Sequence, residues 1–247
     1  MKRPLLLPAF LACLLAGGLS AQTLASWDVN GVDVDDGIGI DGGSTSSPFT
    51  FSAGTTASNV GSATLTLSSS VNPSTSSDQY GFKVSGGNDG FTLSDAISSG
   101  HYMEISISAS SGFLLNLTEL DFIGESSGTG ADSGAILTSV DGFNDSSAIA
   151  TVSGVSGDTG GFDTDGSGFG TISLSGSQYQ GISSISFRVY GWDATSGAGV
   201  TNFRDLSNDD ITISGTVSVN PIPEPGTYGL IAGLAGLGLL IYRRRRG

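Results

Sequence analysis

Cysteine is almost absent from this chain of 247 residues. The one cysteine, Cys13, lies in an apolar stretch near the N-terminus. The chain after it therefore has no disulfides and no cysteine ligands for a metal, and it must depend on a hydrophobic core for stability. The roughly 200 residues that follow are ample for one domain with such a core.

Basic residues are scarce as well. The chain has 23 acidic and nine basic residues, and six of the nine basic ones lie in the first three and the last five positions. Between them, three basic residues stand against 23 acidic ones, a net charge of −20. This surface repels phosphates, so we expect no binding to nucleic acid. The charge favours cations, and it also keeps a protein soluble outside the cell.

Groups for nucleophilic or acid-base catalysis are few. His101 is the sole histidine, and no G-x-S-x-G motif accompanies it. A Ser-His-Asp arrangement would depend on this one side chain at the start of a predicted strand. Paired carboxylates are uninformative, because 23 acidic residues bring some together by chance. We therefore expect that the protein is not an enzyme.

Amphipathic helical patterns are also nearly absent, and two-residue alternation takes their place. Met103, Ile105 and Ile107 alternate with polar residues, which predicts a half-buried strand. In the segment 182–192, Ile185 and its apolar partners are expected to point inward and Arg188 outward. Further strands are predicted at 63–69, 80–85, 114–124, 135–140, 148–155, 171–175 and 210–219.

These short strands, separated by turns rich in Gly, Ser and Asp, predict an all-β fold. We expect an antiparallel β-sandwich of jelly-roll type over residues 22–219. In its 114–124 strand the apolar phase shifts from Leu115 and Leu117 to Leu120 and Phe122, which predicts a β-bulge.

Two kinds of side chain are candidates for binding. Trp27, Tyr190 and Trp192 are aromatic residues that would stack on sugar rings if exposed, although Trp27 is equally suited to the core. Asp163 and Asp165 lie two apart in a glycine-rich turn, and such oxygen ligands suit Ca²⁺. A carbohydrate-binding, lectin-like surface module, with or without calcium, is the alternative function that these residues suggest.

The N-terminus has the pattern of a secretory signal peptide over residues 1–21. Lys2 and Arg3 precede a short apolar run, and small residues end at Ala21, after which we expect cleavage. The apolar run is well below the roughly 20 residues of a membrane span. The mature domain is therefore expected outside the cytoplasm.

The C-terminus has three parts. A linker at 220–226 contains Pro223, Glu224 and Pro225, and residues 227–242 then carry no charge. As a helix those residues would be about 24 Å long, a short transmembrane helix. The basic cluster Arg243, Arg244, Arg245 and Arg246 would hold its end in the cytoplasm by the positive-inside rule.

This order of Pro-Glu-Pro, small-residue helix and arginines resembles the PEP-CTERM sorting tail of exported bacterial proteins. The tail also circulates under the label "ice-binding protein C-terminal domain", which describes the tail alone. The resemblance implies recognition by a membrane-embedded exosortase at Pro223, Glu224 and Pro225. It also implies removal of the helix, and a final location at the cell surface or in the matrix of bacteria that make exopolysaccharide. Extracellular polysaccharide is thus an expected neighbour.

Overall fold

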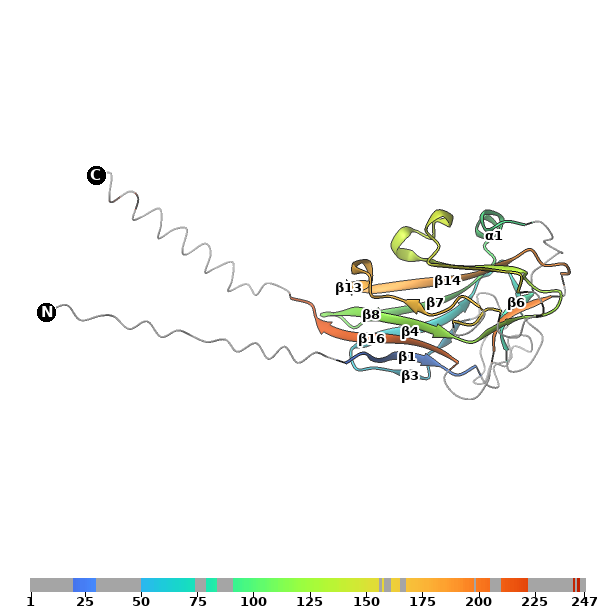
Figure 1. The fold of residues 1–247 in the computed structure, drawn as a ribbon. Coiled ribbons are helices and arrows are strands. Elements are labelled where there is room, and N and C mark those ends of the chain that lie inside the picture. The colour runs from blue at the N-terminus through green and yellow to red at the C-terminus, as the bar shows by residue number, and fades with distance from the viewer. Residues whose placement is uncertain are drawn as a thin grey trace.

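The computed structural model describes residues 20–29, 50–73, 79–83, 91–155, 157, 161–164, 168–197, 199–204, 210–221, 242 and 244. The described chain is mostly β, as the sequence predicts, and its strands form three antiparallel sheets (Figure 1). The predicted signal peptide and C-terminal helix lie outside these residues, apart from Ser20, Ala21, Tyr242 and Arg244. In the described part of the chain, no helix is both long enough and apolar enough to cross a membrane.

The first sheet has six strands, and its central strand is the last one in the chain. Its order is β12 (Ile172–Ser173), β8 (Phe113–Phe122), β16 (Ile211–Val219), β1 (Gln22–Trp27) and β3 (Thr55–Thr56), with β13 (Gln180–Ile182) also paired to β8.

The second sheet also has six strands. Its order is β11 (Ala150–Ser153), β10 (Ser133–Thr138), β14 (Ser184–Trp192), β7 (Tyr102–Ala109), β4 (Val60–Leu67) and β2 (Thr50–Ser52). A smaller third sheet contains β5 (Asn72–Pro73), β6 (Gln79–Lys83), β15 (Val200–Arg204) and β9 (Gly124–Ser126). The predicted strand at 80–85 corresponds to β6, whereas the sequence pattern did not indicate that β6 belongs to a separate third sheet.

The two large sheets form a sandwich around one hydrophobic core. The inner face of the first sheet contributes Leu117 and Ile213, and that of the second contributes Ile105 and Phe187, all fully buried. Eight strands taken in chain order, β1, β7, β8, β10, β11, β12, β14 and β16, lie in the orders 1-8-3-6 and 2-7-4-5 in the two sheets. This is the strand order of a jelly roll, with β2, β3 and β4 added at the edges.

The predicted bulge is present in β8. Ser214 of β16 pairs with Glu119, whereas the next residue, Gly215, pairs with Leu117. Thr118 is therefore the extra residue. The bulge lets Leu117 and Leu120 both face the core although they are three residues apart.

One short α-helix is present in a body for which the sequence predicted almost none. This helix, α1 (Leu93–Ser99), has a capping box in which Thr92 accepts from the backbone of Asp95, and the Asp95 carboxylate accepts from the backbone of Thr92. Gly100 ends it in the left-handed conformation, with φ 69°. The sequence signals for this helix are the capping residues at its two ends, and the helix between them has only seven residues.

Three short 3-10 helices complete the described elements: η1 (Ser139–Asp141), η2 (Asp145–Ser147) and η3 (Ser177–Tyr179). Together with α1, the segment containing η1 and η2 lies over the outer face of the second sheet (Figure 1). These helical segments therefore determine which outward-facing side chains of β14 are exposed.

Candidate functional site

The sorting segment leaves the body directly from its most central strand. β16 pairs with β8 on one side and β1 on the other, and it ends at Val219. The backbone N–H of Asn220 still donates to the carbonyl of Gly112 at 2.9 Å. Pro221 follows and is exposed. The folded body thus extends to Asn220, three residues before Pro223.

The side chains predicted for sorting lie mostly outside the described residues. This holds for Pro223, Glu224 and Pro225, and for three of the four arginines. Arg244 is helical and exposed, and Tyr242, two positions before it, is 53% exposed.

The three candidate aromatic residues do not form a common sugar-binding surface. Trp27, the last residue of β1, is fully buried in the main core, and Tyr190 is 1% exposed. For Trp27 the alternative position in the core is the one observed, whereas for Tyr190 the expectation of an exposed ring is wrong. Trp192 is half-buried at the end of β14. Trp27 and Trp192 also come from different sheets.

Tyr190 is buried because a second, small hydrophobic cluster covers the outer face of its sheet. Ala96 of α1 and Leu137 of β10 pack with Tyr190, and Trp192 lies against the same cluster. Burial raises the pKa of the Tyr190 hydroxyl, while its hydrogen bond with Arg188 acts in the opposite direction. Alternation along the strand predicted the correct face for Tyr190, but it contained no information about the cover.

Arg188 joins this cluster to the open part of the sheet. Its Nε donates to the Glu104 Oε2 at 2.7 Å, and these two residues are directly opposite in β14 and β7. The guanidinium carbon lies 4.1 Å from the centre of the Tyr102 ring and 3.8 Å from that of Phe143. Arg188 is thus held between two aromatic rings.

The contacts of Arg188 hold the β10–β11 connection, which contains Phe143, against the sheet. Burial alone would lower the pKa of Arg188, but hydrogen bonds to Glu104 and Tyr190 outweigh it and raise the pKa. The sequence pattern predicted the outer face for Arg188 but did not indicate its contacts with Glu104 and the two rings. Its rarity, as one of three basic residues in the body, was the signal available.

Beyond Arg188, the outer face of the second sheet carries hydroxyl side chains in register. Opposed pairs lie within hydrogen-bond distance: Ser62 and Ser108 at 2.7 Å, Ser106 and Ser186 at 2.7 Å, and Thr50 and Thr66 at 3.3 Å. We refer to these six residues on β2, β4, β7 and β14 as the hydroxyl face. It presents uncharged donors and acceptors over four neighbouring strands.

Asp163, the first residue of the candidate calcium pair, fastens a loop. Its Oδ1 accepts from the backbone N–H of Gly124 at 2.7 Å. The neighbouring Thr164 hydroxyl accepts from the N–H of Phe122 at 2.8 Å and donates to Asp121. Asp165 lies outside the described residues. Among the residues that are described, no three metal-ligating side chains gather, and calcium here stays a prediction.

His101 lies between α1 and β7 and is half-buried. Its backbone N–H donates to the carbonyl of Ala96, which ties it to the end of the helix. Burial lowers the pKa of the imidazole from its ordinary value. The contact that fixes its position is therefore structural.

Comparison with known proteins gives a family match for one part of the chain. The family model for the PEP-CTERM protein-sorting motif matches residues 221–246, so the resemblance seen in the sequence is confirmed. The motif implies an exported protein that an exosortase recognises and processes at the cell surface. No curated protein and no solved structure matches the chain.

Proposed function

We propose that the chain is a bacterial surface or extracellular-matrix protein whose body is a non-catalytic β-sandwich delivered by its tail. The observation that supports this is the match of the sorting motif to residues 221–246. In this proposal the signal peptide starts export, residues 227–242 hold the protein in the membrane, and the exosortase then removes that segment. The sandwich stays outside, near extracellular polysaccharide.

The roles of the tail are divided. Uncharged residues followed by four arginines suit membrane retention and orientation. Pro223 and Pro225 restrict the backbone before the helix, so they favour an extended flank that presents Glu224 to an enzyme.

Replacing Pro223, Glu224 and Pro225 with alanine is expected to leave export intact and to block processing. The full-length protein should then accumulate in the membrane fraction. Cell fractionation followed by a blot measures the sizes of the membrane-bound and released forms. A matched variant with all four arginines changed to glutamine should weaken retention and orientation instead. Processing of the alanine variant at the parent's rate would show that the triplet is only a linker.

Neutral glycan binding is a second candidate, and the hydroxyl face favours it. That face offers paired hydroxyls over four strands, which suits an uncharged, hydroxyl-rich polymer. The carboxylate of Glu104, which accepts from Ser106 and pairs with Arg188, lies beside these hydroxyls. A Ser108→Lys, Thr66→Lys variant should lose retention on a neutral polysaccharide resin, because lysine side chains would cover the hydroxyls. Trp192→Ala is the matched control, since Trp192 packs on the aromatic cluster. Loss of binding only in the control would move the site to Trp192.

A further inference from the structure

Both ends of the described body leave the sandwich at the same end (Figure 1). Gln22, the first residue of β1, pairs with Gly215 of antiparallel β16, so β1 begins at the end of the sheet toward which β16 runs. β16 itself pairs with β8 up to Val219 opposite Phe113. We name the surface formed there the terminus end: the turns at 57–59, 110–112 and 176–183, together with Val219 and Asn220.

Backbone hydrogen bonds join these turns into one surface. The N–H of Ser110 donates to the carbonyl of Asn59 at 2.8 Å, and the N–H of Ala109 donates to that of Ser183 at 2.8 Å. The N–H of Asn220 donates to Gly112. The exit point of the sorting segment is thus part of the terminus end.

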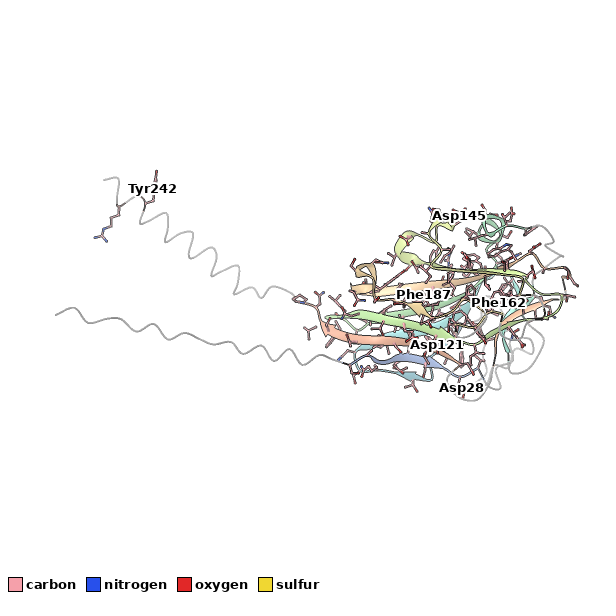
Figure 2. All side chains as sticks on the ribbon, in the orientation of Figure 1. Asp28, Asp121, Asp145, Phe162, Phe187 and Tyr242 are labelled. Carbon is pink, nitrogen blue, oxygen red and sulfur yellow. The ribbon has the colours of Figure 1, made fainter. Side chains whose placement is uncertain are left out.

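The terminus end carries no charge. Five segments lead to this end, 20–27, 50–67, 105–118, 171–187 and 211–221, and they contain no acidic or basic residue and no histidine. The adjacent segment η1, whose Ser139 Oγ accepts from the N–H of Ser186, carries Asp141 and is not part of the terminus end. In a body with a net charge of −20, the described acidic side chains all lie on other segments. Asp28, Asp121 and Asp145 are labelled in Figure 2 and lie away from this end.

An exposed apolar side chain lies on the same surface. Val219 is 70% exposed, the largest exposed fraction among the large hydrophobic residues that the structure describes. Other residues of the terminus end are small or neutral, including Ser111, Ser183 and Asn220. A surface with little charge and an exposed apolar residue is suited to close contact with another protein.

The short chain between the body and the triplet favours such contact during processing. Pro223 is three positions after the hydrogen-bonded Asn220, and an extended chain covers about 10 Å over that span. Even a domain of about 100 residues has a radius of gyration near 13 Å. An enzyme that holds Pro223, Glu224 and Pro225 in its site therefore lies against the terminus end.

From the motif match, the uncharged segments and this short reach, we propose that the terminus end is the docking surface for the membrane-embedded processing enzyme. The inference rests on the proposed processing of the tail. It adds that the body takes part in recognition, and that the absence of charge at this end permits the contact. The described acidic residues lie at the opposite end and on the outer face, so they do not prevent docking of the terminus end on the enzyme.

The test places charges on the full-length chain in cells that contain the processing enzyme. One variant carries glutamate, and a second carries lysine, at three exposed positions of the terminus end. A matched control carries glutamate at three exposed positions at the far ends of β11 and its neighbouring loops. The terminus-end positions are Ser58, Ser111 and Ser183, and the control positions are Ser153, Thr129 and Thr195.

Both the glutamate and the lysine variants of the terminus end should be processed about tenfold more slowly, because docking would desolvate unpaired charges. The control should match the parent. Ten Gly and Ser residues inserted between Asn220 and Pro221 of the glutamate variant should restore processing, because the body then no longer touches the enzyme. Melting of the detergent-solubilised chains verifies that all variants are folded.

Several results would overturn the proposal. Processing of the glutamate variant at the parent's rate would show that no contact is made. Slowing of the glutamate but not the lysine variant would identify anionic lipid headgroups as the neighbour. Equal slowing of the control would indicate net charge, and failure of the inserted linker would exclude direct contact. Failure of the proposed function is distinguishable, because then the triplet-to-alanine variant is itself processed normally.

Discussion

At the scale of single residues, Arg188 has the most contacts of consequence on the outer face. It pairs with Glu104 and stacks between Tyr102 and Phe143. Each cation–π contact at a partly exposed site contributes about 0.5–1 kcal/mol, and a partly exposed ion pair contributes up to about 1 kcal/mol. Packing on aromatic rings, more than charge alone, makes this arginine important.

Arg188→Ala is therefore expected to lower the free energy of unfolding by about 1–3 kcal/mol. Urea unfolding, followed by tryptophan fluorescence, measures the change. Glu104→Gln removes only the ion pair and is the matched control, with an expected loss below about 1 kcal/mol. An equal loss in both variants would mean that the ring contacts of Arg188 contribute nothing.

At the scale of elements, β16 connects the fold to the sorting segment. Its alternate residues Ile211 and Ile213 are fully buried, and it lies between β8 and β1 in the first sheet. Removing β16 would leave two long strands without their common partner and would expose the core. Removing the chain after Pro221 would leave every described strand intact.

Truncation separates these two cases. A chain that ends after Pro221 should melt cooperatively at the same temperature as the full chain, because β16 is complete. A chain that ends after Asp210 should give no cooperative transition, because unpaired backbone and apolar side chains are left at the centre of the sheet. Circular dichroism during heating measures both. A cooperative melt in the shorter chain would contradict the central role of β16.

At the scale of the whole molecule, the described acidic residues lie away from the end at which both chain termini leave the body. The segments next to the two chain exits are uncharged, and the described acidic residues lie on other segments. This arrangement suits a protein held at a membrane by one end before release, because the acidic surface then lies away from the membrane and its enzyme. The net charge of −20 would also keep the released body soluble.

Local sequence patterns were sufficient for most of the long strands and for the bulge, although not for β1 or β15. Met103, Ile105 and Ile107 lie in the core because alternation fixes the face of a strand whatever covers it. The phase shift between Leu117 and Leu120 predicted a bulge for the same reason, and its extra residue is Thr118. The sorting motif could also be predicted from the sequence, because an enzyme that recognises a short linear segment contacts consecutive residues.

Burial of outer-face residues depended on contacts between distant segments. Alternation predicts that Tyr190 points away from the core, and it does, but α1 and the β10–β11 connection cover it. The pairing of Glu104 with Arg188 requires the β7–β14 register, which joins residues 84 apart in the chain. Sequence periodicity contains no information about either.

The sequence by itself determined the strand faces, the charge balance and the sorting tail, because each depends on neighbouring residues or on composition. Only the tertiary structure decided that Trp27 and Tyr190 are buried and that Asp163 fastens a loop. It also brought the uncharged segments to the end at which the chain exits. The physical reason is that burial and surface patches arise from the sheet order, which brings segments far apart in the sequence side by side.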